Sequence, residues 1–166
     1  MMVTLSMHPQ LRHSLLTRLR TRVVHTYFRF SRGLTMGAQG CVLNDQNQVF
    51  LIRHTYIPGW HFPGGGVETG ETILEAVTRE LQEEGNLYLT GAPRLFSLYL
   101  NRAVSKRDHI ALFIVRDFVQ SAPRMGDHEI AEARFFALND LPETLHSATR
   151  RRLDEILNNK PPSALW

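Results

Sequence analysis

The sequence contains little cysteine and no long apolar run. Its 166 residues include one cysteine, Cys41, so no disulfide can form within the chain. Because Cys41 lies in an apolar stretch, we interpret it as a small core residue rather than a reactive thiol. No apolar run approaches the length that spans a membrane, and the first residues lack the unbroken apolar core of a signal peptide. We therefore expect a soluble, cytoplasmic protein.

The sequence also carries only a small excess of charge of one sign. The formal net charge is +3, and the basic residues concentrate toward the N-terminus and in one late loop around Lys106 and Arg107. Because this excess is local, it gives weak support to a polyanion-binding role, and we expect no stable nucleic-acid partner. With 43% hydrophobic residues, the chain can bury a substantial core and form one globular domain.

Residues 8–32 carry an apolar stripe at helical spacing, with arginines interleaved. The stripe consists of Leu11, Leu15, Leu19, Val23 and Tyr27. We predict a basic amphipathic helix within an N-terminal segment of residues 1–33. Such a helix can dock on its own domain or on a sister subunit, lie on a membrane surface, or bind a polyanion. We favour docking over the other two, which leaves a homodimer open.

From residue 34 onward, short β-rich runs alternate with helical patterns. The predicted strands lie within residues 37–45, 48–54, 95–103, 109–119 and 132–138. The first two are predicted to form a hairpin around the polar residues 45–47, and helices are expected at about 72–84 and 142–159. This order predicts an α/β fold over residues 34–160, with a mixed sheet between helices and a loose tail at 161–166.

The central predicted helix has a clear start and a clear core side. Thr72 and Glu75 fit a capping box, so the helix is expected to begin there. The side expected to face the core consists of Ile73, Leu74, Val77 and Leu81.

Three glutamates crowd into one turn near the end of this helix. At about 100° per residue, Glu80, Glu83 and Glu84 project from an adjoining face. Arg79 lies within reach of Glu75 and Glu83 but cannot neutralise three acids. Converging carboxylates either protonate or recruit cations, and ligands that are all oxygen suit Mg²⁺ or Mn²⁺. A solvated acidic face is the alternative interpretation.

A glycine-rich loop precedes the helix and decides between these interpretations. Residues 64–66 are three consecutive glycines, which allow the backbone to approach an ion or a phosphate closely. One glycine-rich loop is weak evidence of a site, but its place next to an acidic helix strengthens the metal hypothesis.

The two features together resemble the Nudix box. Gly65, Glu71 and the run from Arg79 to Leu87 match its pattern of Gly, five residues, Glu, seven residues, then Arg-Glu-U-x-Glu-Glu-x-Gly-U, where U is aliphatic. The one departure is Asn86 in place of the last glycine. Asn is the next-best residue for a left-handed helix end, so we expect the cap to survive.

The resemblance implies the Nudix α/β/α sandwich and hydrolysis of a nucleoside diphosphate linked to another group. Glu83 and Glu84 would be metal ligands, and Glu80 would be a ligand or the base that activates water. The carbonyl of Gly64 could complete the coordination of Mg²⁺ or Mn²⁺. Arg79 would orient the glutamates, Glu71 would support the loop, and Gly65 is a fixed position of the motif.

Four residues outside the box are further site predictions. Glu129 is a predicted metal ligand or base, with Glu132 as its competitor. Arg53 could contact a substrate phosphate or form a surface ion pair. Trp60 and Phe62 could stack on a base, although core packing is the more common role. The histidines show no metal-ligand spacing, and His54 and His61 are interpreted as structural or solvent-facing.

The sequence does not name the substrate. Markers that accompany the box in relatives acting on ADP-ribose, diadenosine polyphosphates or NADH are absent, which leaves nucleoside triphosphates, deoxynucleotides with damaged bases and nucleotide sugars. The main alternative is a Nudix-fold module that binds a nucleotide without cleaving it; such modules usually lack box glutamates, all of which are present here. An isoprenoid diphosphate isomerase is a third hypothesis, for which Cys41 is thin support.

Overall fold

The computed structural model describes residues 20–24, 27 and 33–166. The chain divides into two units, Met1–Leu34 and Thr35–Trp166. In the first unit, residues 20–24 and 27 are helical, and the other positions of the helix predicted at residues 8–32 lie outside the described residues. Within the described part of the chain, no helix is long and apolar enough to cross a membrane.

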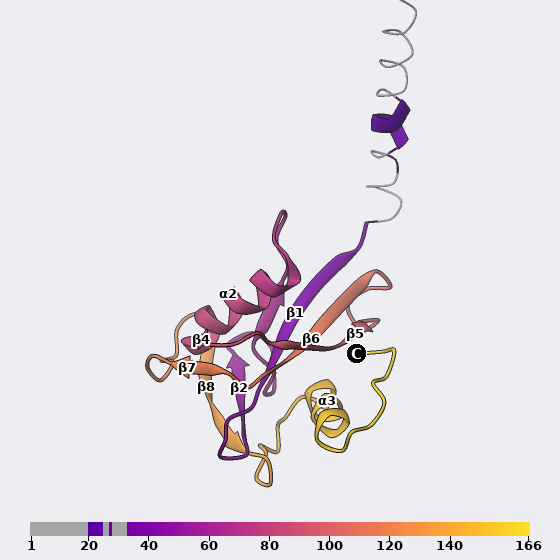
Figure 1. Cartoon of the computed structure of the whole chain (residues 1–166). Helices are drawn as coiled ribbons and strands as arrows, with labels where there is room; N and C mark the ends of the chain where they lie inside the picture. Colours follow the sequence, from indigo (N-terminus) through magenta and orange to yellow (C-terminus); the bar gives the residue numbers. More distant parts are fainter. Residues whose placement is uncertain (1–19, 25–26, 28–32) are drawn as a thin grey trace, which may run out of the picture. The chain divides into compact units, whose positions relative to one another are not determined.

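A mixed four-stranded sheet forms the centre of the second unit. Its strands follow the order β3 (Gly64–Gly66), β1 (Thr35–Val42), β6 (Asp108–Val115) and β5 (Arg94–Leu100) (Figure 1). β1 and β6 are parallel, and the other two pairs are antiparallel. β5 and β6 are joined by the predicted basic loop, so this part of the sequence prediction is confirmed.

Two smaller antiparallel pairs complete the strands. β2 (Gln48–His54) pairs with β8 (Ile130–Ala137), and β4 (Leu87–Leu89) pairs with β7 (Phe118–Gln120). The prediction that the first two strands pair as a hairpin is wrong except at the turn that joins them. A single bridge joins Leu43 to Val49, after which the two strands enter different sheets. Local residues were enough to predict the polar turn, whereas the strands that pair with β1 and β2 are distant from them in sequence.

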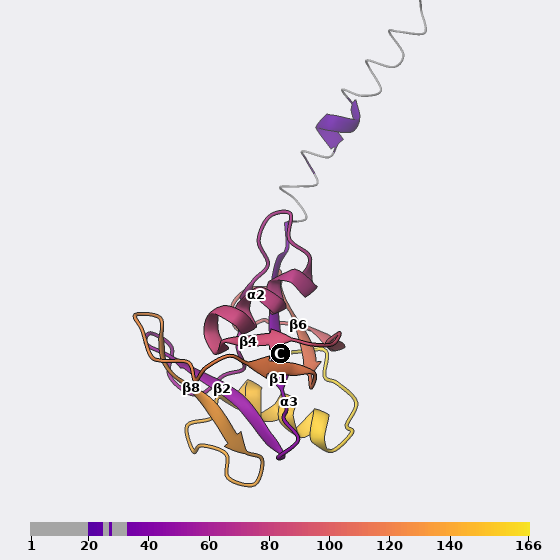
Figure 2. The same ribbon diagram turned by 60° about the vertical axis from the view of Figure 1, so that its left-hand side comes forward.

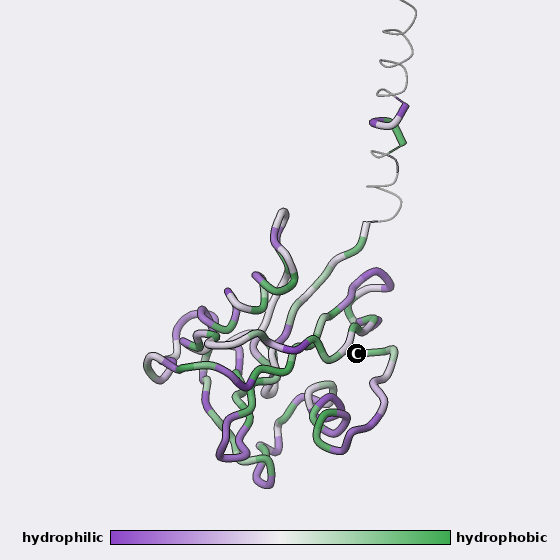
Figure 3. Tube along the Cα trace, viewed as in Figure 1, coloured by the Kyte–Doolittle hydropathy of each residue, from purple (hydrophilic) through white to green (hydrophobic). Residues whose placement is uncertain are grey.

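Helices cover both faces of the central sheet, as the sequence predicts (Figure 1, Figure 2). Successive β6 residues point to opposite faces. Ala111 and Phe113 pack in the cluster that contains Leu81 of α2 (Ile73–Gly85), whereas Leu112 packs in the cluster that contains Leu153 of α3 (Ser147–Leu157). The hydrophobic segments accordingly follow the central strands (Figure 3).

Helix α2 has the predicted ends. Thr72 and Glu75 form a complete capping box, and Asn86 takes the left-handed conformation, with φ 54° and ψ 32°. One core assignment is wrong. Leu74 is 45% exposed, and it lines a shallow hollow of about 740 Å³ on the outer side of α2.

The prediction of a loose tail at residues 161–166 is also wrong. The amide of Trp166 donates to the carbonyl of Leu100 at 3.1 Å, and its ring packs edge-on against Tyr99 with 5.3 Å between centroids. Beneath it, the buried Arg152 donates to the carbonyl of Leu165 at 2.7 Å and to Glu155 at 2.6 Å. The tail thus covers a buried ion pair, which would be costly to leave without its partners.

Replacing Trp166 by Ala is therefore expected to destabilise the fold by about 2 kcal/mol, because the ring covers Tyr99 and the guanidinium of Arg152. Urea unfolding measures the change. Leu157→Ala is the matched control, since Leu157 is an exposed apolar residue of α3. Equal stability of the Trp166 variant and the control would refute the role given to the tail.

Candidate active site

The glycine loop packs closely between β1 and the acidic helix. Gly64 has a φ of 147°, and a Cβ there would overlap the carbonyl oxygen of Ala38. Its amide donates to Oε2 of Glu84 at 2.6 Å. A Cβ on Gly65 would overlap the carboxylate of Glu80. The lack of a side chain at Gly64 therefore allows β3 to lie close to β1, and the lack of one at Gly65 allows the carboxylate of Glu80 to lie against the backbone of β3.

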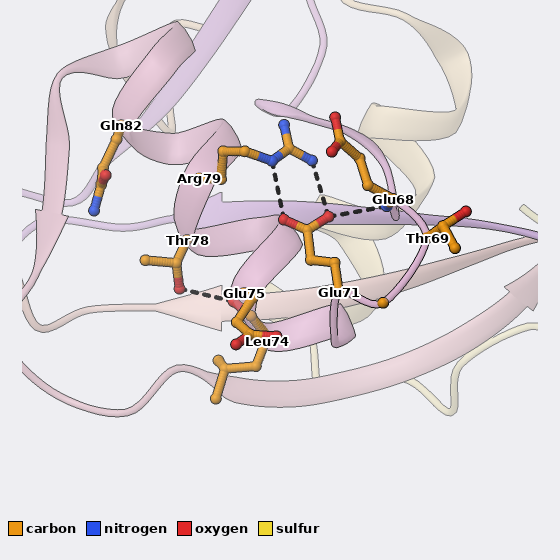
Figure 4. A pocket seen from close by; sticks show the side chains of 9 residues that line it. Glu68, Thr69, Glu71, Leu74, Glu75, Thr78, Arg79 and Gln82 are labelled. Carbon is orange, nitrogen blue, oxygen red and sulfur yellow. Dashed lines mark hydrogen bonds and ion pairs between the residues drawn. The ribbon is translucent and has the colours of Figure 1, made fainter.

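Arg79 connects the loop to the glutamates. Its Nε and Nη2 donate to the two carboxylate oxygens of Glu71 at 2.9 and 3.1 Å, a bidentate pair (Figure 4). Its Nη1 donates to Glu80 at 2.7 Å and to Glu83 at 3.3 Å. The orienting role of Arg79 stays a prediction, and these bonds are the contacts through which it would act. The expected contact with Glu75 is absent, because Glu75 closes the capping box instead.

A cavity of about 350 Å³ opens where the loop meets α2. Its acidic wall consists of Glu80 and Glu84 from the helix and Glu129 from the segment before β8. The other lining residues are Gln39, His54, Tyr56, Ile57, His61, Phe62 and residues 64–66. Glu83 is not part of this lining; its side chain is 60% exposed.

The environment of the cavity disfavours negative charge. Burial raises the pKa of Glu84 to about 8, and the nearby carboxylates of Glu80 and Glu129 act in the same direction, against the hydrogen bond from Gly64. Burial also raises the pKa of Glu80, although Arg79 opposes the rise. A bound cation would relieve the cost of placing these carboxylates together.

Without a cation, the raised pKa of Glu84 makes stability depend on pH. Its pKa rises from an ordinary 4.5 to about 8, so its contribution to stability is fully present below 4.5 and is lost as the pH rises toward 8. We expect the melting temperature of EDTA-treated protein to fall across this window, and to fall less in Glu84→Gln. Thermal unfolding tests this, with Glu143→Gln as the exposed control. Identical pH profiles for all three proteins would contradict the assignment.

The donor chemistry fits a hard divalent cation. The acidic wall and the Gly64 backbone offer only oxygen atoms, which Mg²⁺ and Mn²⁺ prefer. Within the described residues, no group of three or more His, Cys, Asp or Glu side chains is already gathered as a metal site. Arg79 bonds Oε1 of Glu80 and the amide of Gly64 bonds Oε2 of Glu84, which leaves the other oxygen of each carboxylate for a cation.

The structure distinguishes between Glu129 and Glu132, the two candidates for a further metal ligand or base. Glu129 lines the cavity with Glu80 and Glu84, and one of its oxygens lies 3.4 Å from the hydroxyl of Tyr56. Glu132 lies outside the cavity and forms an ion pair with Arg53. Of the two, Glu129 is therefore the residue that the fold brings to the acidic wall.

A second hollow, of about 660 Å³, contains the predicted substrate residue Arg53 and also Arg134. The two hollows share His54, Tyr56 and Ile57. Arg53 lines the hollow and forms the ion pair with Glu132, while its contact with a substrate phosphate stays a prediction.

The buried positions of Trp60 and Phe62 argue against the predicted stacking on a base. The two residues are 5% and 1% exposed and belong to the core cluster on the α3 side of the sheet. The guanidinium groups of Arg53 and Arg134 also lie over the Trp60 ring, at 6.0 and 5.6 Å from its centroid. Little of either ring is therefore open to a base.

Sequence reasoning missed two polar residues of the cavity. Gln39 Oε1 and His54 Nδ1 are buried without a hydrogen-bond partner in the described structure. Burial and the neighbouring His61 lower the pKa of His54, whose Nε2 lies 3.9 Å from Oε1 of Glu84. His54 follows an irregularity in the β2–β8 register at Arg53, and such irregularities redirect side chains. No residue spacing in the sequence predicts this change in the direction of the His54 side chain.

Comparison with known proteins agrees with this geometry. A family model described as NUDIX domain matches residues 34–156. The chain belongs to the Nudix family. Its relatives include a protein named ADP-ribose pyrophosphatase from Methanocaldococcus jannaschii, 34% identical over 106 residues that make up 61% of this chain and 62% of that protein. Another, named RNA pyrophosphohydrolase, from Francisella tularensis subsp. mediasiatica, is 54% identical over 43 residues, or 26% of this chain and 28% of that protein.

Solved structures give the same answer for the fold. The crystal structure of MutT NUDIX hydrolase from Burkholderia pseudomallei matches with a TM-score of 0.63 and 26% identity, covering 74% of this chain and 97% of that one. The Nudix α/β/α sandwich expected from the sequence is therefore confirmed. The chain spans less than two thirds of the length of the two curated relatives above.

Proposed function

We propose that this Nudix chain is a divalent-cation-dependent pyrophosphohydrolase that cleaves a phosphoanhydride bond in a nucleoside diphosphate linked to another group. The observation that carries the proposal is the arrangement around Arg79, which fixes Glu71 and Glu80 beside a cavity walled by Glu84 and Glu129. The names of the relatives, which refer to pyrophosphatases, support the same reaction class.

In this proposal, Glu83, which lies outside the cavity lining, acts together with the oxygen donors of the cavity. Glu83, Glu84 and Glu129, with the carbonyl of Gly64, would hold the cation. When bound, Mg²⁺ or Mn²⁺ neutralises the diphosphate and activates the attacking water. Glu80 accepts the proton of that water. Arg79 holds Oε1 of Glu80, which leaves Oε2 for the proton.

We assign the substrate contacts to residues at the edge of the cavity and in the neighbouring hollow. Tyr56 and Ile57 are exposed where the two hollows meet, so they are better placed than Trp60 or Phe62 to contact a nucleoside. Arg53 and Arg134, in the neighbouring hollow, supply positive charge for a phosphate. The candidate substrates are nucleoside triphosphates, damaged deoxynucleotides and nucleotide sugars, to which the relatives' names add ADP-ribose and RNA.

A module that binds a nucleotide without cleaving it is the alternative. It is disfavoured because every carboxylate of the box is present, and Arg79 bonds Glu71, Glu80 and Glu83. The cytoplasmic location, the homodimer and the docking of residues 8–32 stay predictions.

Product analysis by anion-exchange chromatography tests the proposal. The protein is incubated with each candidate substrate, with Mg²⁺ or with EDTA, and Glu84→Gln serves as the site control. We expect a nucleoside monophosphate, or another phosphate-containing half, to appear from one substrate class only with Mg²⁺ and wild-type protein. Folded protein that binds the nucleotides but leaves all of them intact would favour the binding module.

A further inference from the structure

We propose that Arg124 and Asp127 form a clamp that holds Glu129 at the acidic cavity, which makes Arg124 a positioning residue for the cation site. The inference rests on the proposed function, because it takes Glu129 as a cation ligand. Arg124 belongs to neither the Nudix box nor the lining of the cavity. Its role follows from the two segments that its guanidinium connects.

The guanidinium of Arg124 connects the last turn of α2 to the segment that carries Glu129. Its Nε donates to the backbone carbonyl of Glu83 at 2.9 Å, and Nη1 donates to the carbonyl of Met125 at 2.5 Å. Its Nη2 pairs with the carboxylate of Asp127. The carbonyls of a last helical turn lack partners within the helix, and a cation there is favourable. Arg124 thus bonds the backbone of one proposed ligand while holding the segment of another.

Asp127 links Arg124 to the backbone of Glu129. Its Oδ1 accepts from the amides of Glu129 and Ile130, both at 2.8 Å, and its own amide donates to the carbonyl of Ile130 at 2.8 Å. From the other side, the amide of Thr55 at the end of β2 donates to the carbonyl of Glu129 at 2.9 Å. The backbone of Glu129 is therefore fixed between Asp127 and β2, and its side chain reaches the cavity wall.

These contacts serve placement more than folding. Residues 121–129 include no buried residue, so the segment adds little to the hydrophobic core. Its order depends on polar contacts, which include those of the clamp and also bonds from Asn86 to the carbonyl of Ala122 and from Thr55 to the carbonyls of His128 and Glu129. Loss of the clamp should therefore free Glu129 with little loss of global stability. A purely structural arginine would show the opposite pattern.

The test measures Mn²⁺ binding by electron paramagnetic resonance, so it needs no substrate. In Arg124→Ala we expect the Mn²⁺ dissociation constant to rise about tenfold, the usual effect of removing a group that orients a metal ligand. The melting temperature of the metal-free protein should stay close to that of wild type. Arg94→Ala is the matched control, because Arg94 is an exposed arginine on the edge strand β5; its Mn²⁺ affinity should equal that of wild type.

A double-mutant cycle with Glu129→Gln separates positioning from a general effect of charge. Glu129→Gln alone should weaken Mn²⁺ binding, and adding Arg124→Ala should change the constant by less than about twofold, because the clamp acts through Glu129. Wild-type affinity in Arg124→Ala, an undiminished Arg124 effect in the Glu129→Gln background, or no effect of Glu129→Gln would overturn the clamp. Wild-type Mn²⁺ binding would still stand in each of those cases. Absence of Mn²⁺ binding by wild type would overturn the proposed cation site and the clamp together.

Discussion

Glu83→Gln is expected to lower kcat by about a thousandfold, because the substitution removes an anionic oxygen from the cation site. The fold should remain intact, since the Glu83 side chain is 60% exposed and its only described hydrogen bond is the one from Arg79 at 3.3 Å. Steady-state hydrolysis of the substrate identified by product analysis gives kcat, and circular dichroism checks the fold.

The control for this variant is Glu143→Gln, which neutralises an exposed glutamate outside the cavity. It should retain wild-type kcat. Activity of Glu83→Gln within a few-fold of this control would remove Glu83 from the ligand set. The remaining proposed ligands, Glu84, Glu129 and the Gly64 carbonyl, would then have to suffice.

Arg79→Lys is expected to lower kcat by about a hundredfold, even though it conserves the charge. One ammonium group cannot reproduce the planar fork that bonds both oxygens of Glu71 while also reaching Glu80. Its loss also frees the carbonyl of Gly66, to which Nη2 donates at 3.0 Å. We therefore expect misplacement of the loop and of Glu80 to affect kcat more than KM.

Steady-state kinetics with varied substrate and Mg²⁺ would measure this effect, with Arg94→Lys as the matched substitution on β5. Full activity of Arg79→Lys would show that charge, rather than hydrogen-bond geometry, is what the position supplies. Glu71→Gln should reproduce part of the loss, because Glu71 is the bidentate partner of Arg79.

The box was predictable from sequence because its determinants are local. The capping box at Thr72 and Glu75, the left-handed Asn86 and the glycines that admit the carboxylates all lie within residues 64–87. Helical periodicity alone places Glu83 one turn from Arg79, and the structure joins the two side chains by a hydrogen bond of 3.3 Å. Such relations need only the geometry of one helix and one turn.

What the sequence could not provide depends on contacts between distant segments. β1 pairs in parallel with β6, some 70 residues away, so the local turn suggested the wrong partner for it. The clamp of Arg124 and Asp127 joins a surface segment to a helix about 40 residues earlier, with no periodic signal. Leu74 shows the same limit, because a helical stripe does not indicate where the neighbouring core ends.

The most direct test of the central claim is a Mn²⁺ titration of wild-type protein beside Glu83→Gln and Glu84→Gln. The claim is that the carboxylates of the last turns of α2 hold a divalent cation at the cavity. We expect wild type to bind Mn²⁺, Mg²⁺ to compete for the same site, and each variant to bind at least tenfold more weakly, by analogy with the loss of metal-orienting groups. Equal Mn²⁺ affinity in all three proteins would place any cation elsewhere and contradict the account.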